Sequence, residues 1–245
     1  MKKRNLDGNE VKIELVRAML SHVPFDGWTW TAMEQGAVDI NFKKNKSENQ
    51  RLEIYKTFFN NGTIDFIKVF AEIIDSRVQE NYNSLDPKPQ RIPEKIKKLI
   101  LMRLDFCLPY REAIRSSLSL TALPKNSKQS IKILYTTCNR MWRLAGDKST
   151  DFSFYTKRLS LASVYASTLL FWLNDTSSEQ EETEYFLERR LADISMISKL
   201  KKPLNIFQNI SKNINVGNNS LGIKSIFNII KSINKIKKSS FSKPF

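Results

Sequence analysis

Glycine and proline are scarce in this chain, whose 245 residues include only seven Gly and eight Pro. An all-β protein of this length needs more turn residues, so the scarcity favours a helical fold. Apolar residues make up 41% of the sequence, which is enough to build a core and argues against a wholly disordered chain. The length fits one large domain, or one domain with an appendage.

Histidine and cysteine are rarer still. His22 is the only histidine of the sequence, which excludes a metal site of several histidines, or a diiron site of Glu-x-x-His pairs, built from these residues. Any Ser-His-Asp or Cys-His set would have to use His22, and its place at a helix end beside a proline turn favours a structural role. Cys107 and Cys138 lack CxxC spacing, so we interpret them as inert thiols in a reducing compartment.

Several targeting and cofactor signatures are also missing. No GxGxxG and no Walker loop occurs, so the sequence offers no nucleotide-binding motif. No apolar stretch follows the basic start MKKR, which predicts that there is no secretory signal. No run reaches the roughly 18 apolar residues of a membrane span. We therefore expect a protein in the cytosol or on the cytosolic face of a membrane.

Positive charge is abundant but unevenly distributed. The net charge is +15, and the stretch from Lys199 to Phe245 holds ten Lys and no acidic residue. The first 198 residues carry 30 basic and 25 acidic groups, so most of the excess belongs to the end of the chain. This distribution predicts a polyanionic partner for the basic C-terminal segment from Lys199 onward. The partner would be either nucleic acid or an anionic bilayer surface.

Apolar residues recur at helical spacing along most of the chain, and no strand-like alternation of useful length occurs. The periodicity predicts helices over 10–22, 31–36, 47–59, 63–82, 93–107, 109–124, 127–142, 151–174 and 178–199, with a polar loop at 41–47. Three pairs have capping-box spacing: Thr31 with Glu34, Ser47 with Gln50, and Ser178 with Glu181. The helix over 151–174 is apolar nearly all round, which is typical of a central helix with two partners.

The tail, residues 203–245, is predicted to form two amphipathic helices, over 204–214 and 221–238. One face of the second is apolar and the other is basic, a pattern typical of helices that lie in a membrane interface. The apolar membrane-binding candidates are Ile223, Ile226, Phe227, Ile230 and Ile233, and the basic ones are Lys224, Lys231 and Lys235. The alternative is a helix that packs on the protein's own core.

The segment 145–158 places two basic residues, Lys157 and Arg158, among aromatics at the head of the apolar helix. A guanidinium in this position suits a phosphate or another polar headgroup, with lipid tails running into the core. The alternative is a structural ion pair with Asp193 or Glu188, and residue chemistry alone leaves both open. The acidic residues of 179–184 lie in the first turns of a helix, where they complement its dipole, so we interpret them as a solvated face.

Specific motifs in this region also carry a resemblance. Residues 123–194 contain AGDxSTDFxxYTKR, LASVYASTLLFWLND and FLERRLAD, and they closely resemble the family of the ninth coenzyme Q biosynthesis protein. The stretch HVPFDGWTWTAMEQGA (22–37) resembles the N-terminal segment of that family. Good matching covers about half of the chain, and the order of the motifs is kept.

The resemblance implies an all-α, tetracycline-repressor-like helical bundle that is usually dimeric. It implies three parts: a degenerate helix-turn-helix over 1–60, a lipid-binding bundle over 61–202 and the membrane-binding tail over 203–245. The function implied is that of a non-enzymatic accessory protein of ubiquinone biosynthesis, peripheral on the cytosolic face of the inner membrane. Its hydrophobic cavity would hold phospholipid or polyprenyl quinone intermediates, and no cofactor is expected.

The same resemblance implies site residues. Arg158 would bind a phospholipid headgroup, and the other lipid-binding candidates are Trp142, Tyr165, Leu169 and Trp172. The protein would present substrate to demethoxyubiquinone hydroxylase through a surface patch of Asp151, Phe154, Tyr155 and Asn139. The chain departs from the family pattern at two places, because many members have Trp-Tyr at 154–155 and Asp at 139. The second change removes one negative charge from the patch.

Two other functions compete with this interpretation. The succession of short helices predicted over residues 10–60 is compatible with the helix-turn-helix domain of a DNA-binding regulator of the tetracycline-repressor type. The basic composition is compatible with it as well. However, the polar stretch NFKKNKSENQ stands where a compact repressor has a short turn, and most of the charge accompanies Ile and Phe residues that DNA binding does not need. We therefore expect no specific nucleic acid partner. An enzyme acting on quinone precursors is the third possibility, and the lack of a cofactor motif argues against it.

Overall fold

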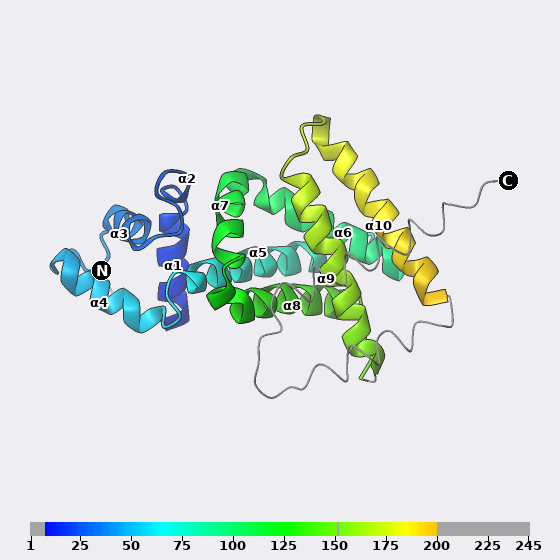
Figure 1. Cartoon of the computed structure of the whole chain (residues 1–245), viewed down its shortest axis with the longest axis horizontal. Helices are drawn as coiled ribbons and strands as arrows, with labels where there is room; N and C mark the ends of the chain where they lie inside the picture. Colours follow the sequence, from blue (N-terminus) through cyan, green and yellow to red (C-terminus); the bar gives the residue numbers. More distant parts are fainter. Residues whose placement is uncertain (1–7, 151, 200–245) are drawn as a thin grey trace. The chain divides into compact units, whose positions relative to one another are not determined.

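The computed structural model describes residues 8–150 and 152–199, and within these ranges the chain is helical and contains no strand (Figure 1). The predicted all-α class is therefore confirmed. Asp151 and the whole tail lie outside the described residues. This applies to all the predicted membrane-binding positions: Ile223, Lys224, Ile226, Phe227, Ile230, Lys231, Ile233 and Lys235.

The chain divides into two compact units. The first comprises residues 1–89 and 98–126, and the second comprises residues 90–97 and 127–245. The three-part division at residues 60 and 202 stays a prediction. The polar connection between residues 84 and 91 leads from the first unit to the start of the second.

The first unit is built from short helices around one long helix, α5 (Ile64–Asn83). Its other elements are α1 (Gly8–Met19), α2 (Val23–Asp26), α3 (Trp30–Asp39), α4 (Glu48–Phe58), the second part of α6 (Ile92–Cys107), η1 (Leu108–Tyr110), α7 (Arg111–Thr121) and η2 (Pro124–Asn126). Helix α1 packs against both α3 and α5. Trp28 fixes the loop after α2, because its ring lies 5.6 Å from that of Phe70 and its Nε1 donates to the carbonyl of Ala113 at 2.8 Å.

The structure corrects two details of the second predicted helix. Thr29 caps α3 instead of Thr31, because the hydroxyl of Thr29 accepts a hydrogen bond from the backbone nitrogen of Ala32. The helix also continues beyond Gly36 to Asp39. A Cβ added at Gly36 would lie only 2.5 Å from the backbone nitrogen of Met19, so this glycine permits close packing of α1 and α3 and does not end a helix.

The capping box predicted at the start of α4 is confirmed. The hydroxyl of Ser47 accepts from the backbone nitrogen of Gln50, and the side chain of Gln50 accepts from the backbone nitrogen of Ser47. Arg51 on this helix forms an ion pair with Glu34, and the hydroxyl of Tyr55 donates to the same carboxylate at 2.8 Å. These contacts attach α4 to α3 through partly buried polar groups.

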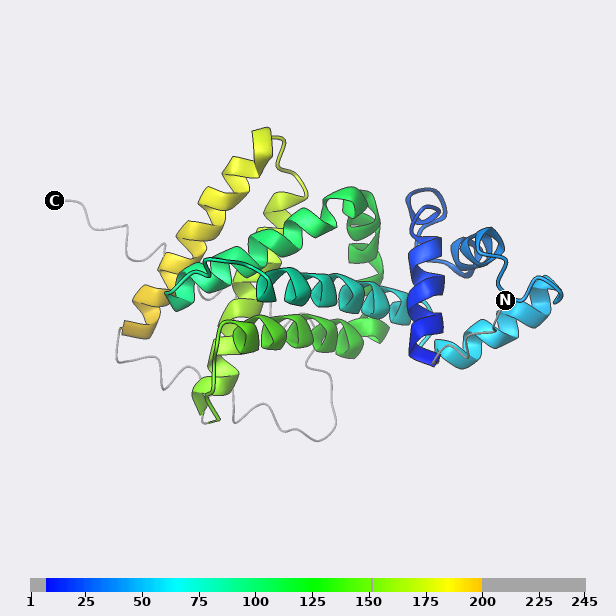
Figure 2. The same cartoon turned by 180° about the vertical axis from the view of Figure 1, so that it is seen from behind.

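The second unit has α9 (Phe152–Trp172) as its central helix. Helix α9 packs against α8 (Ser127–Leu144) on one side and against α10 (Glu181–Lys199) on another, as Figure 2 shows from behind. This arrangement explains why its sequence is apolar nearly all round, and it confirms the interpretation as a helix with two partners. Lys97, in the first part of α6, joins α10 through ion pairs of 2.6 Å with Glu184 and 2.5 Å with Glu188.

The start of α10 differs from the prediction. Ser178 lies in a short 3₁₀ turn, η3 (Ser178–Gln180), and does not form a capping box with Glu181. Asp175 supplies the acceptors instead, because its carboxylate accepts from the backbone nitrogens of Ser177 at 2.8 Å and of Thr183 at 2.9 Å. Burial acts to raise the pKa of Asp175, but these bonds and the hydroxyls of the same two residues outweigh it and lower the pKa to about 2.

Candidate functional site

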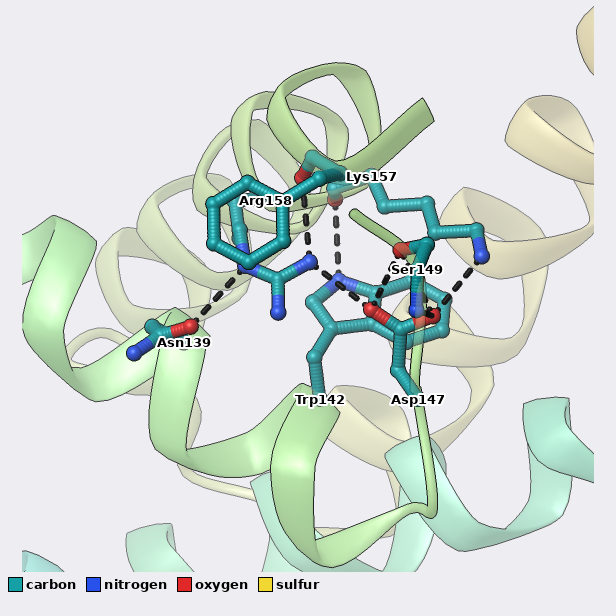
Figure 3. Close-up of polar contacts among 7 residues, drawn as sticks. Asn139, Trp142, Asp147, Ser149, Lys157 and Arg158 are labelled. Atoms are coloured by element: carbon teal, nitrogen blue, oxygen red, sulfur yellow. Dashed lines mark hydrogen bonds and ion pairs between the residues drawn. The ribbon is translucent and has the colours of Figure 1, made fainter. Parts of the chain in front are cut away.

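Arg158 is the centre of the candidate site. It projects from α9 toward α8, and only 1% of its surface is exposed (Figure 3). Its Nε donates to the side-chain oxygen of Asn139 at 2.9 Å. Its Nη1 donates to Asp147 at 2.8 Å and to the backbone carbonyl of Phe154 at 3.0 Å. A charged side chain this deeply buried is uncommon unless it is paired, so these contacts explain how it is accommodated.

The remaining nitrogen of the guanidinium is not used. A guanidinium has five N–H donors, and Nη2 carries two of them. Nη2 makes no hydrogen bond with any residue that the structure describes (Figure 3). The ring of Phe154 covers one face of the group, with Cζ of Arg158 3.4 Å from the ring centroid. The group is thus fixed on three sides and still has two donors available.

Asp147 is the acceptor that organises the cluster. It follows Gly146, whose φ of 93° ends α8 in a conformation that favours glycine. Its carboxylate accepts from Nζ of Lys157 at 2.8 Å and from the hydroxyl of Ser149 at 2.8 Å, as well as from Arg158. Burial acts to raise the pKa of Asp147, but the bonds from Lys157, Arg158 and Ser149 outweigh it and hold the pKa well below its ordinary value.

Trp142 fixes the position of Lys157. Its Nε1 donates to the backbone carbonyl of Lys157 at 2.9 Å, and Nζ of Lys157 lies 5.7 Å from the centre of the indole ring. The described side chains of the cluster therefore hold two cations, Lys157 and Arg158, against one carboxylate, Asp147. The cluster has one positive charge in excess, which suits an anionic ligand.

Arg158 does form an ion pair, as the structural alternative predicted, but its partner is neither Asp193 nor Glu188. Arg158 pairs with Asp147, whereas Asp193 pairs with Arg190 at 3.2 Å and Glu188 pairs with Lys97. No role for Asp147 could be predicted from the sequence. Its place just after a helix-ending glycine, ten residues before Lys157, was the available signal, but that signal does not say which side chain approaches it.

The other lipid-binding candidates lie along one stripe of α9. Tyr165, Leu169 and Trp172 follow Arg158 at intervals of seven, four and three residues, which places all four on one face of the helix. Tyr165 and Trp172 are buried, and Leu169 is partly buried. Nε1 of Trp172 donates to the side chain of Gln180. The structure thus gives a continuous apolar stripe that starts at a buried cation.

The partner-patch candidates have different surroundings. Tyr155 is 65% exposed, and its ring lies 5.1 Å from that of Phe154 in an edge-to-face arrangement. Phe154 and Asn139 are occupied by Arg158, and Asp151 lies outside the described residues. Tyr155 is therefore the member of the patch that is most available to a partner.

The first unit holds a buried cation of its own. Its buried ion pair joins Arg103 to Asp75 at 2.8 Å, with Cys107 beside Arg103. Burial raises the pKa of the Cys107 thiol to about 11, which keeps the thiol protonated and unreactive at neutral pH. Nε2 of His22 lies 2.6 Å from the carboxylate of Asp39, in agreement with the structural role expected for this residue.

The described ranges contain neither a cluster of metal-ligating side chains nor a helix that could span a membrane. Neither 8–150 nor 152–199 contains a group of three or more His, Cys, Asp or Glu side chains that could hold a metal ion. In the same part of the chain, no helix combines the length and apolar character needed to cross a membrane.

Residues 127–198 match the COQ9 family model. The chain is 29% identical over 191 residues to the ubiquinone biosynthesis protein COQ9, mitochondrial, of Homo sapiens, covering 75% of this chain and 57% of that protein. It is 30% identical to COQ9-B, mitochondrial, of Xenopus laevis, covering 75% of this chain and 62% of that one. The chain therefore spans less than two thirds of the length of these relatives. For the Schizosaccharomyces pombe protein the identity is 27%, over 78% of this chain and 72% of that protein.

A solved structure of similar fold is the TetR transcriptional regulator from Nitrosomonas europaea ATCC 19718. The TM-score is 0.53 with 18% identity, covering 74% of this chain and 96% of the regulator. The likeness confirms the tetracycline-repressor-like fold. The matched family range contains every residue of the Arg158 cluster, from Asn139 to Arg158.

Proposed function

From the match of residues 127–198 to the COQ9 family model, we propose that the chain takes part in ubiquinone biosynthesis as a lipid-binding accessory protein. The curated relatives are named for that pathway, and the sequence resemblance pointed to the same family. Within this role, the protein would hold a phospholipid or a polyprenyl quinone intermediate at a membrane surface and present it to demethoxyubiquinone hydroxylase.

One observation carries the lipid-binding proposal: Arg158 is a 99% buried cation with an unused Nη2. Nη2 is not among the described side-chain nitrogens that are both fully buried and unpaired, so it is the part of this guanidinium that a ligand can reach. A phosphate oxygen is the acceptor that best matches a guanidinium in geometry and charge. A headgroup at Nη2 would therefore satisfy the donors that the protein leaves open.

The surroundings of Arg158 extend the argument to a lipid. The stripe of Tyr165, Leu169 and Trp172 begins at Arg158 and runs along α9 for fourteen residues, which corresponds to about 21 Å. An acyl or isoprenoid chain has a comparable length and the same apolar character. The proposed ligand thus combines one anionic group with a long apolar chain, in the order that α9 presents them.

The membrane and the enzyme partner belong to the same proposal. The basic amphipathic pattern of the tail supports peripheral binding to an anionic membrane, for which we keep the cytosolic face of the inner membrane as the expected side. Exposed Tyr155, next to the Arg158 cluster, is the proposed contact for the hydroxylase. A homodimer of the tetracycline-repressor type is the proposed assembly.

Two features argue against the competing functions. In α4, which follows the polar loop in the helix-turn-helix-like part, both basic side chains are occupied by carboxylates of the same chain: Arg51 pairs with Glu34, and Lys56 with Glu53 at 2.8 Å. A DNA-reading helix needs free basic side chains for phosphates and base edges. We also propose no catalytic role, because the cluster around Arg158 holds cations and one firmly ionised carboxylate, without a candidate base.

Native mass spectrometry of the purified full chain, followed by organic extraction, tests the proposal. We expect phospholipid or polyprenyl quinone to be recovered with the wild-type protein. Arg158→Lys keeps the charge but removes Nη2, so it should retain about one tenth of the lipid. Arg189→Lys, which changes an exposed arginine of α10, is the matched control and should retain all of it.

Three outcomes contradict parts of the proposal. A wild-type protein without lipid would overturn lipid binding as the function. Full lipid retention by Arg158→Lys would show that Arg158 has only a structural role. A lipid-free protein that shifts an operator-length DNA fragment at physiological salt would favour the regulator instead.

A further inference from the structure

We propose that Asn139 is a positioning residue that sets both the direction and the net charge of the Arg158 cluster, and through them its affinity for a phosphate-bearing anion. The inference rests on the proposed function, since it takes Arg158 as the group that binds the headgroup. It concerns a residue that sequence reasoning had placed in a protein-partner patch. In the structure its side-chain oxygen lies 2.9 Å from Nε of the guanidinium (Figure 3).

Asn139 determines which nitrogen of Arg158 remains available. Its side-chain oxygen occupies Nε, while Asp147 and the carbonyl of Phe154 occupy Nη1. With these two nitrogens held, the group cannot rotate without breaking hydrogen bonds, and Nη2 is left as the available nitrogen. A pre-oriented donor binds its acceptor more tightly than a mobile one, because less conformational freedom is lost on binding.

Asn139 also leaves the cluster positively charged, because an amide accepts the hydrogen bond without adding a negative charge. Among the described side chains of the cluster, Lys157 and Arg158 face the single carboxylate of Asp147. A carboxylate in place of the amide would bring the net charge of the cluster to zero. The bound anion would then meet a neutral cluster, and it would also face a negative charge close to Arg158.

A substitution at Asn139 should change the affinity for the anion and the stability of the fold in opposite directions. Asn139→Asp should strengthen the anchoring of Arg158, because a charge-assisted hydrogen bond replaces a neutral acceptor. The same change should weaken anion binding. A residue with a purely structural role would not show opposite changes, since damage to the fold would lower the stability and the affinity together.

The experiment uses the full chain, stripped of lipid, and two soluble probes. Inorganic phosphate and dihexanoyl phosphatidylglycerol below its micelle concentration are titrated calorimetrically, so that free phosphate and lipid headgroup are distinguished. We expect Asn139→Asp to bind the phosphatidylglycerol about tenfold more weakly than the wild type, with an equal or higher melting temperature. Gln129→Glu makes the same amide-to-carboxylate change ten residues earlier on α8, about 15 Å away, and should leave the affinity unchanged.

The outcomes distinguish this inference from the function on which it rests. If Arg158→Lys does not weaken binding of either probe, the headgroup site itself is wrong. If Arg158→Lys weakens binding but Asn139→Asp binds as the wild type does, the site stands and the role of Asn139 is overturned. An equal loss in Asn139→Asp and Gln129→Glu would assign the effect to overall charge and would also overturn it.

Discussion

At the scale of single residues, Tyr155 gives a direct test of the proposed enzyme contact. It is 65% exposed although it stands one position from Phe154, which packs on Arg158. Exposed aromatic residues beside a rigid cluster are common centres of protein interfaces. We expect Tyr155→Ala to reduce the affinity for demethoxyubiquinone hydroxylase by about tenfold or more, measured by pull-down and by biolayer interferometry.

Tyr185 on α10 provides the control for this prediction. It is 60% exposed and belongs to the same compact unit, so Tyr185→Ala removes a similar side chain from another place. The lipid content of both variants should equal that of the wild type. Equal hydroxylase binding by Tyr155→Ala and the wild-type protein would contradict the proposed contact.

Residue chemistry alone could identify Arg158 but not its partners. A guanidinium beside aromatics at the head of an apolar helix is visible in the sequence, and the family motif names the same position. Its contacts with Asn139 and Asp147 span 19 and 11 residues and depend on how α8 meets α9. Local pattern does not determine such contacts, and this is why the predicted pairs with Asp193 and Glu188 were wrong.

At the scale of helices, the packing of α1 against α3 depends on Gly36. Ala has the higher helix propensity by about 1 kcal/mol, so Gly36→Ala would stabilise an isolated α3. In the protein, the added Cβ would lie 2.5 Å from the backbone nitrogen of Met19 and 2.7 Å from the backbone carbon of Ala18. Backbone atoms cannot rotate away, so we expect a net loss of about 2 kcal/mol in the free energy of unfolding.

Urea denaturation followed by far-ultraviolet circular dichroism measures this loss. Gly8→Ala is the matched control, because nothing lies within 4 Å of a Cβ built at Gly8 in the first turn of α1. The control should unfold within about 0.5 kcal/mol of the wild type. A Gly36→Ala variant as stable as the control would show that α1 and α3 separate at little cost.

The elements themselves were largely predictable, and their ends were less so. Periodic apolar residues located α5, α8 and α9 because burial of one face determines where a helix can form. Caps were predicted correctly at Ser47 and wrongly at Thr31 and Ser178. Thr29 and Asp175 were nearby alternatives of the same chemistry, and only the direction of the entering chain selects between such neighbours.

At the scale of the whole molecule, the proposed lipid site and the proposed membrane-binding tail lie in separate parts of the sequence. The Arg158 cluster lies within the matched family range 127–198, and the basic amphipathic pattern begins only after it. Ten of the 40 basic residues lie from Lys199 onward, among Ile and Phe and without any acidic residue. We therefore expect that one activity can be removed while the other is kept, because distant sites contribute independently.

The tail should therefore control vesicle binding without affecting the bound lipid. Changing both Ile226 and Phe227 to Asp removes two apolar anchors and adds two negative charges to the predicted interfacial helix. We expect flotation with vesicles of phosphatidylglycerol and phosphatidylcholine to fall by about 30-fold or more, while lipid recovery by native mass spectrometry stays at the wild-type level. Changing both Asn228 and Asn234 to Asp adds the same charge on polar positions and should reduce flotation far less. Unchanged vesicle binding by the first variant would contradict the membrane role of the tail, and loss of bound lipid in that variant would show that the tail also belongs to the lipid site.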